Sequence, residues 1–236
     1  MKKTVLIIGS AGGIGSAIIN RFDSEKYNLA LNYFTNSPAL DARDGVNFYQ
    51  ADITVESEVK QMIDQIINDF GSLDIVVNNA GVSISEISWK TKLSNWDKTI
   101  AVNLTGPFLV SKYALPYMRQ NNWGRIIFIS SIVAQTGFAG TSAYAASKAG
   151  LLGLTKSLAK EVATKGITVN TIALGYFNTG MINDVPEDMK NEIVDTIPKK
   201  ALGDPLQLFD TIQYIIDDKM DYLTGQTINL NGGLYM

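Results

Sequence analysis

The chain has 236 residues, of which 46% are hydrophobic and 18% charged, the composition of a globular protein long enough to bury a core. Its net charge of −3 argues against a nucleic acid or an anionic membrane held by bulk electrostatics. Because cysteine and histidine are both absent, disulfides, thiolate zinc sites and histidine-based nucleophile systems are excluded, and no metal site is expected.

Short apolar runs alternate with amphipathic stretches along the chain. Strands are predicted at 4–9, 28–33, 46–50, 73–78, 124–130, 167–172 and 227–230, and helices at about 14–22, 55–69, 94–119, 142–164 and 205–217. The strand runs are continuously apolar, which is typical of parallel strands buried on both faces. Repeated β–α units predict an α/β fold with a doubly wound parallel sheet.

Nothing in the sequence divides the chain or addresses it to a membrane. No linker, repeat or low-complexity segment interrupts residues 1–236, so a single domain is expected. No apolar run approaches the roughly 20 residues that span a bilayer. The N-terminal sequence KKTVLIIGSAGG reaches glycines too early for a signal peptide. We therefore expect a cytoplasmic protein with no membrane partner.

The heptapeptide GSAGGIG at 9–15 follows the first predicted strand and begins the first predicted helix. Glycines in such a turn let the backbone approach a pyrophosphate, whose charge is met by amide groups at the helix N-terminus. This position favours a dinucleotide turn over a simple tight turn. The candidate cofactor contacts are Gly9, Ser10, Gly13, Ile14 and Gly15 after the first strand, Asp52 and Ile53 after the third, and Asn79, Ala80 and Gly81 after the fourth. Ordinary turn chemistry is the alternative at the later positions.

The end of the second strand bears on the type of dinucleotide. An acidic residue there would bind the ribose 2′-hydroxyl and favour NAD. Residues 32–38 contain no acid, and Asn32 and Thr35 are the candidate contacts. Ser37 and Pro38 also read as the N-cap and first residue of a short helix near 38–43, whose free amides suit a 2′-phosphate. NADP is therefore favoured, with NAD as the alternative because the loop has no basic residue.

The segment SAYAASKAG at 142–150 places Tyr144 four residues before Lys148. Residues at that spacing lie on one face of a helix. A nearby ammonium favours the phenolate and lowers the pKa of a tyrosine, so Tyr144 is a candidate general acid. The alternative is a solvated pair that arose by chance. Ser131, at the end of the fifth strand, is a candidate for polarising a carbonyl, and Asn103 is an unfavourable residue inside a predicted helix.

Together, Gly9-x3-Gly13-x-Gly15, NNAG at 78–81, Asn103, Ser131 and Tyr144-x3-Lys148 resemble the short-chain dehydrogenase/reductase family over nearly the whole chain. Ser131 lies 13 residues before Tyr144, the spacing found in that family. The resemblance implies a Rossmann-type sheet with a seventh strand and a nicotinamide cofactor. It also implies a homotetramer or a dimer, with the Tyr144 helix and its small residues at a subunit contact.

The resemblance also implies a role for each site residue. Tyr144 would protonate the carbonyl oxygen, and Ser131 would orient that carbonyl. Lys148 would lower the pKa of Tyr144 and bind the nicotinamide ribose, and Tyr144 itself would contact the cofactor. Asn103 would hold a water that links Lys148 to solvent. Thr179 matches the residue that contacts the nicotinamide carboxamide or the phosphates.

Within the family, the chain is most similar to reductases of 3-oxoacyl-carrier-protein and acetoacetyl-CoA, on the segments 121–131, 161–172 and 223–236. This implies NADPH-dependent reduction of a 3-oxoacyl thioester in fatty acid biosynthesis, with CoA or an acyl-carrier protein as the thiol. Lys156, Lys160 and Lys165 are candidate carrier contacts, with a solvated helix face as the alternative. The competing functions are a dehydrogenase of a sugar, diol or other secondary alcohol, and a non-catalytic dinucleotide-binding regulator.

Three features depart from the family pattern. Ile8 stands where a threonine is usual before the first glycine, and Leu174 stands where a proline is usual before Gly175. The connection between the second and third strands is also shorter than in the reductases. Residues 174–200 contain two prolines after a predicted strand. They are expected to be either a substrate lid or a plain surface excursion.

Overall fold

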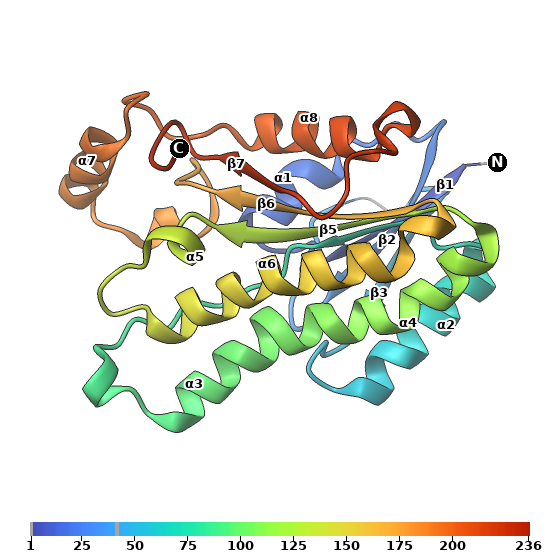
Figure 1. The fold of residues 1–236 in the computed structure, drawn as a ribbon, viewed down its shortest axis with the longest axis horizontal. Helices are drawn as coiled ribbons and strands as arrows, with labels where there is room; N and C mark the ends of the chain where they lie inside the picture. Colours follow the sequence, from blue (N-terminus) through green and yellow to red (C-terminus); the bar gives the residue numbers. More distant parts are fainter. Residues whose placement is uncertain (1, 41–42) are drawn as a thin grey trace.

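The computed structural model describes residues 2–40 and 43–236 and contains a seven-stranded parallel sheet between two layers of helices (Figure 1). The strand order is β3-β2-β1-β4-β5-β6-β7. The strands are β1 (Lys3–Ile8), β2 (Tyr27–Tyr33), β3 (Val46–Gln50), β4 (Ile75–Asn78), β5 (Gly124–Ser131), β6 (Ile167–Leu174) and β7 (Thr227–Leu230). The order reverses between β1 and β4, and in doubly wound sheets the ligand crevice lies at this point.

Continuous apolar strands produce this sheet because helices cover both of its faces. Every residue of β5 and β6 is buried. On one face pack α2 (Glu56–Phe70), α4 (Gly106–Asn121) and α6 (Ser142–Val162), and on the other α1 (Gly13–Ile19) and α8 (Pro205–Ile216). The core is thus two apolar layers, with Leu6 and Val76 in the first and Val5 and Val77 in the second. The predicted α/β architecture is confirmed.

The long helix predicted at 94–119 is interrupted. It consists of α3 (Leu93–Ile100), a π-helical turn η2 (Ala101–Thr105) and α4, which follow one another along nearly the same path. A π turn inserts one extra residue into a helix, and such insertions are frequent at functional sites. Here the inserted turn contains Asn103, the residue whose low helix propensity stood out in the sequence.

The short helix predicted near 38–43 is not formed by the described residues of that segment. Residues 38–40 and 43 are not helical, and residues 41–42 lie outside the described part of the chain. Leu40 instead packs against the α1-side core from an irregular segment, held by a bond from its amide to the Pro38 carbonyl. The free helix amides that favoured a 2′-phosphate are therefore not provided at Pro38.

The segment 174–200 contains a helix that the sequence pattern did not indicate, α7 (Glu187–Thr196), after the 3-10 turn η4 (Gly180–Asp184). None of the α7 residues is fully buried. The two ends of the segment are tied to the end of β7: the Gly175 amide bonds the Leu230 carbonyl at 2.9 Å, and the Lys199 amide bonds the Gly232 carbonyl at 3.1 Å. The segment is therefore a flap with fixed ends.

The remaining helical elements are short turns. A helical turn α5 (Val133–Thr136) follows β5, and 3-10 turns lie at Ser88–Lys90, Ala163–Lys165 and Asp218–Met220. No helix in the described ranges 2–40 and 43–236 is long and apolar enough to cross a membrane.

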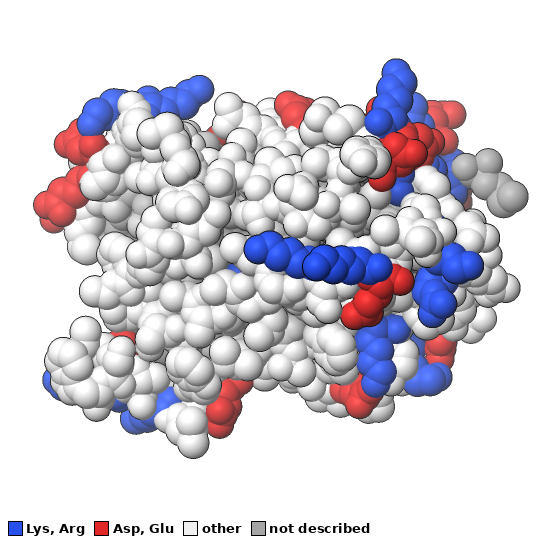
Figure 2. Space-filling view, viewed as in Figure 1, with Lys and Arg blue, Asp and Glu red and all other residues white. Residues whose placement is uncertain are grey.

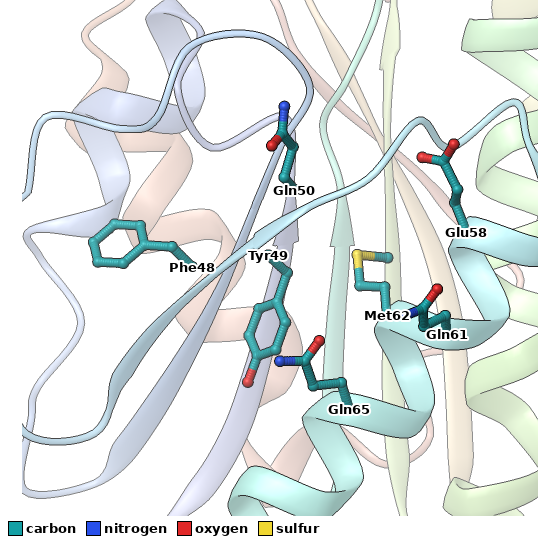
Figure 3. Close-up of a pocket in the computed structure, with 7 residues that line it drawn as sticks. All are labelled: Phe48, Tyr49, Gln50, Glu58, Gln61, Met62 and Gln65. Atoms are coloured by element: carbon teal, nitrogen blue, oxygen red, sulfur yellow. The ribbon is translucent and has the colours of Figure 1, made fainter.

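A cavity of about 300 Å³ lies between β3 and α2, lined by Phe48, Tyr49, Gln50, Glu58, Gln61, Met62 and Gln65 (Figure 3).

Candidate active site

The strand ends of β5 and β6 bring together residues that are far apart in the sequence. Both strands end at the side of the molecule where α5 and α7 lie (Figure 1). Ser131 is the last residue of β5, and Tyr144 and Lys148 are in the first turns of α6, which packs against both strands. Asn103 reaches the same place from η2, which also contacts α6. The four residues predicted as catalytic therefore lie in one cluster, whereas the cavity beside β3 contains none of them.

The side chains of Ser131 and Tyr144 lie close together, and the Ser131 hydroxyl accepts from the Val133 amide at 3.2 Å. Burial raises the pKa of Tyr144, and the Ser131 hydroxyl, close enough to act as a hydrogen-bonding partner, opposes that rise. Ser130 has a different role, since its hydroxyl donates to the Lys148 carbonyl at 2.9 Å and is buried. Ser131 rather than Ser130 is thus the serine whose hydroxyl is near the Tyr144 phenol.

The ammonium of Lys148 is buried. Its Nζ donates to the Ile129 carbonyl at 2.8 Å and lies 5.8 Å from the centre of the Tyr144 ring. Burial lowers the pKa of Lys148 to about 8. The pKa of Tyr144 is raised, and Lys148 is not among the causes. Burial thus outweighs any lowering of the Tyr144 pKa in this structure, and the expected effect of Lys148 on the phenol stays a prediction.

The depressed pKa of Lys148 predicts a pH effect on stability. The unfolded state holds this proton up to about pH 10.5 and the folded state only up to about pH 8, so folding releases it in between. The cost of burying the ammonium is therefore complete below pH 8 and declines as the pH rises. Relative to Lys148→Met, the wild type should gain roughly 2 kcal/mol of unfolding free energy between pH 7 and pH 9.5.

Urea denaturation of both proteins at the two pH values measures this difference. The comparison across pH removes the constant cost of leaving the Ile129 carbonyl without its donor in the variant. A difference between the two proteins that does not change with pH would show that the ammonium is not desolvated.

Asn103 uses its whole side chain to hold a neighbouring loop. Its carboxamide oxygen accepts from the Val82 amide at 2.8 Å, and its nitrogen donates to the Val82 carbonyl at 2.8 Å and the Ser147 hydroxyl at 3.1 Å. Its own backbone carbonyl cannot receive the usual helical bond from four residues ahead, because Pro107 has no amide hydrogen. If Asn103 binds a water, the backbone carbonyl is therefore the group to expect.

The glycine-rich turn after β1 is packed too closely for larger residues. Gly9 has φ +71°, a left-handed conformation that favours glycine, and a Cβ there would lie 2.8 Å from the Ala80 Cα. The Asn79 carboxamide donates to the Gly9 carbonyl at 3.0 Å, so the loop after β4 is bonded to the turn after β1. Gly15 is equally enclosed, since a Cβ there would overlap the Gly9 carbonyl oxygen. The turn predicted from the sequence is formed.

Ser10 and Asn32 were expected to contact a cofactor, but the structure buries both and uses them internally. The Ser10 hydroxyl donates to the Asn32 carbonyl at 2.7 Å. The Asn32 carboxamide donates to the Tyr49 and Ala51 carbonyls at 3.3 and 3.2 Å, and its oxygen accepts from the Gly9 amide at 3.4 Å. Their side chains are thus supports that position the turn and the end of β3, and they are not available to a ligand.

The remaining predicted cofactor contacts surround the crevice. Thr35 is exposed, Ile14, Asp52, Asn79, Ala80, Gly81 and Thr179 are half-buried, and Ile53 is buried. One Asp52 carboxylate oxygen accepts from the Thr54 amide and hydroxyl at 2.9 and 2.7 Å. Ile53 packs against Gly106, where a Cβ would lie 2.7 Å from its side chain. Gly81 faces both Lys148 and Asn103, so it connects this group to the catalytic cluster.

Three residues at the site were not predicted from the sequence. Ser147 bridges Asn103 and the Tyr144 carbonyl, to which its hydroxyl donates at 2.7 Å, and its place between Tyr144 and Lys148 was the available signal. Gly180 lies against Gly13, so closely that a Cβ on Gly13 would overlap the Gly180 backbone. Tyr176 is close enough to raise the pKa of Tyr144. The last two belong to the 174–200 flap, whose path no local pattern reveals.

Comparison with known proteins gives full-length matches. Residues 9–235 match the family model described as enoyl-(acyl carrier protein) reductase. The chain is 38% identical over 244 residues to the 3-oxoacyl-[acyl-carrier-protein] reductase of Staphylococcus epidermidis, covering 100% of both chains. It is 40% identical to nodulation protein G of Azospirillum brasilense, covering 99% of this chain and 98% of the relative. It is 38% identical to acetoacetyl-CoA reductase of Rhizobium meliloti, covering 100% and 99%.

Proposed function

The chain belongs to the short-chain dehydrogenase/reductase family, and we propose on that basis that it reduces a 3-oxoacyl thioester to the 3-hydroxyacyl thioester with NADPH as hydride donor. Its enzyme class is that of an oxidoreductase acting on CH–OH and C=O groups. The observation that carries the proposal is that Ser131 ends β5 beside the first turns of α6, which carry Tyr144 and Lys148 and pack against that strand. Two full-length relatives are named for 3-oxoacyl thioester substrates, which supports this substrate class.

A dinucleotide would lie over the turn after β1. Gly9, Gly13 and Gly15 have no room for a Cβ, which at any of the three would collide with neighbouring atoms. Such a turn would hold the pyrophosphate. Asp52 would accept from the adenine, and Lys148 and Thr179 would lie toward the nicotinamide end. When bound, the dinucleotide would supply a hydride to the substrate carbon.

The chain supplies the proton and the orientation of the substrate. The raised pKa keeps Tyr144 protonated near neutral pH, which is the state that a general acid for carbonyl reduction needs. Its phenol would donate a proton to the carbonyl oxygen while the Ser131 hydroxyl fixes that oxygen by a hydrogen bond. Lys148, with a pKa of about 8, can both release and accept a proton near neutral pH and would restore the proton of Tyr144. Asn103 would help by holding the loop at Val82.

The choice of NADPH over NADH depends on the end of β2. No acid lies at residues 32–38, and Thr35 and Ser37 present exposed hydroxyls there. A carboxylate would repel a 2′-phosphate, so its absence supports NADPH, although the loop provides neither the predicted helix amides nor a basic residue. NADH is the alternative donor.

We also propose a cytoplasmic homotetramer whose subunits meet through α6. Gly153 and Ala146 are exposed on this helix, and no atom of the described residues lies within 4 Å of a Cβ at Gly153. The surface in front of α6 carries few charged side chains (Figure 2). Gly150 has a different reason to be small, because Leu104 of the same chain occupies that space. Lys156 and Lys160, both exposed, and the half-buried Lys165 are the candidate contacts for an acyl carrier.

The test is a pair of fluorescence titrations with NADPH and NADH, followed by turnover of acetoacetyl-CoA with the preferred dinucleotide. We expect NADPH to bind more tightly and acetoacetyl-CoA to be reduced. The matching family model has the description enoyl-(acyl carrier protein) reductase. Crotonyl-CoA, an enoyl thioester, therefore serves as the comparison substrate, and we expect that it is not reduced. Reduction of ketones or oxidation of sugars and diols, without any thioester turnover, would replace the proposal by a secondary-alcohol dehydrogenase. Binding without turnover would indicate a regulatory protein.

A further inference from the structure

The backbone around Tyr176 is fixed by neighbouring segments on both sides. The preceding Gly175 amide bonds the Leu230 carbonyl at 2.9 Å, and the Tyr176 carbonyl accepts from the Gly203 amide at 2.9 Å. Gly203 in turn accepts from the Asn178 amide at 2.9 Å, and its pairing with Phe177 is a parallel β-bridge. Tyr176 is therefore held in extended backbone directly after β6, before the part of the flap that leaves the sheet.

This backbone directs the Tyr176 side chain toward the catalytic cluster. Adjacent residues of an extended chain point to opposite sides. Phe177 is buried in the α8-side core, and a Cβ on Gly203 would lie 2.9 Å from its ring. Tyr176 consequently points to the other side, where it is half-buried and close enough to influence the Tyr144 phenol electrostatically. A second phenol, from the flap, thus lies on the same side as the catalytic cluster.

The proposed mechanism gives the Tyr176 phenol no role, whereas the proposed substrate has a carbonyl oxygen that lacks a hydrogen-bond donor. A 3-oxoacyl thioester has two carbonyl oxygens, one on C3 and one on C1. Ser131 and Tyr144 serve the oxygen on C3, Lys148 is assigned to the nicotinamide end and the Tyr144 proton, and the Asn103 carboxamide is already bonded to protein groups. Burial of the C1 oxygen without a donor would be costly, and a site that provides one gains discrimination against ketones lacking it.

We propose, on the basis of the thioester reductase function above, that the Tyr176 hydroxyl donates a hydrogen bond to the C1 carbonyl oxygen of the substrate. Tyr176 is then a specificity-determining residue that takes no part in proton or hydride transfer. Burial raises the pKa of Tyr176, which keeps the phenol protonated as a donor. With both carbonyl oxygens held, one face of C3 is presented for reduction, so the same contact contributes to the handedness of the 3-hydroxy product.

The test combines Tyr176→Phe with a substrate that lacks the C1 oxygen. Addition of CoA to but-3-en-2-one gives the 3-oxobutyl thioether, which matches acetoacetyl-CoA except that CH₂ replaces the thioester carbonyl. For acetoacetyl-CoA we expect Tyr176→Phe to lower kcat/KM about tenfold. For the thioether we expect less than a twofold change. Comparing the effect of the substitution on the two substrates, as in a double-mutant cycle, cancels the difference in intrinsic reactivity between the two ketones.

Controls separate this contact from a general disturbance. Tyr27→Phe removes another half-buried phenol, bonded to Gln213 at the opposite ends of the strands, and should leave both substrates unaffected. The Kd for the dinucleotide and the Tm of Tyr176→Phe should match the wild type. Equal losses on the thioester and the thioether, or no loss on the thioester, would overturn the role of Tyr176 while leaving the thioester reductase function in place. A wild type that reduces no thioester would instead overturn the function itself.

Discussion

Replacement of Tyr144 by phenylalanine is expected to lower kcat for acetoacetyl-CoA about a thousandfold and leave the Kd for the dinucleotide within twofold. A positioned general acid contributes 10²- to 10⁴-fold to such a step. Ser131 is far too weak an acid near neutral pH to replace the phenol, and Lys148 would act through Tyr144 rather than on the substrate. The ring remains in Tyr144→Phe, so the packing of α6 should be kept. Stopped-flow reduction and fluorescence titration measure the two quantities.

The matched control for this variant is Tyr222→Phe, which removes a phenol hydroxyl from a fully exposed side chain. It should be indistinguishable from the wild type. Near-normal turnover in Tyr144→Phe would mean that another group delivers the proton, and the assignment of the general acid would be wrong. Loss of dinucleotide binding together with turnover would place Tyr144 in cofactor binding alone.

Replacement of Gly13 by alanine is expected to weaken dinucleotide binding at least tenfold and to lower the Tm by several degrees. The new Cβ would overlap the Gly180 backbone and lie 3.1 Å from the Thr179 hydroxyl oxygen, so the flap must move away from the turn. Backbone cannot yield as a flexible side chain does, and such overpacking typically costs 1–3 kcal/mol. Titration with NADPH and thermal denaturation followed by circular dichroism measure the two effects.

Gly12→Ala provides an adjacent control with the same chemical change. A Cβ at Gly12 would meet its nearest atom at an ordinary 3.7 Å, and its backbone, with φ −82° and ψ 158°, suits alanine. This variant should bind the dinucleotide nearly as the wild type does. If Gly12→Ala and Gly13→Ala weakened binding equally, contact with the flap would not be the reason that residue 13 is glycine.

Much of the architecture could be predicted because parallel strands covered on both faces need continuous apolar sequence. TVLII and GRIIFIS have no alternation to confuse with other structure, and each forms a strand within a residue or two of the predicted limits. The Tyr144 helix was equally plain. The break at Ala101–Thr105 was not predicted, although Pro107 signalled that the helical bonding changes nearby. A proline in the first turn of a helix and one inside a longer helix give the same local pattern.

The sequence predicts which residues make up the candidate site, but it does not predict the directions of their pKa shifts. The spacing of Ser131, Tyr144 and Lys148 placed them at one strand end, yet the direction of the Tyr144 pKa shift depends chiefly on burial, which a motif does not specify. Asn32 shows the same limit: its position after β2 suggested a ligand contact, while its hydrogen bonds to the Tyr49 and Ala51 carbonyls exist only once β3 lies beside β2.

The flap with its fixed ends has a consequence for how this protein can change. Its ends are bonded to the end of β7, whereas α7 between them buries no residue completely. Residues 183–196 can therefore be replaced by another sequence, and the packing of the sheet and of the catalytic cluster should stay nearly the same. A new substrate range can arise by substitution, insertion or deletion within this one stretch of sequence, without selection first having to preserve a redesigned core.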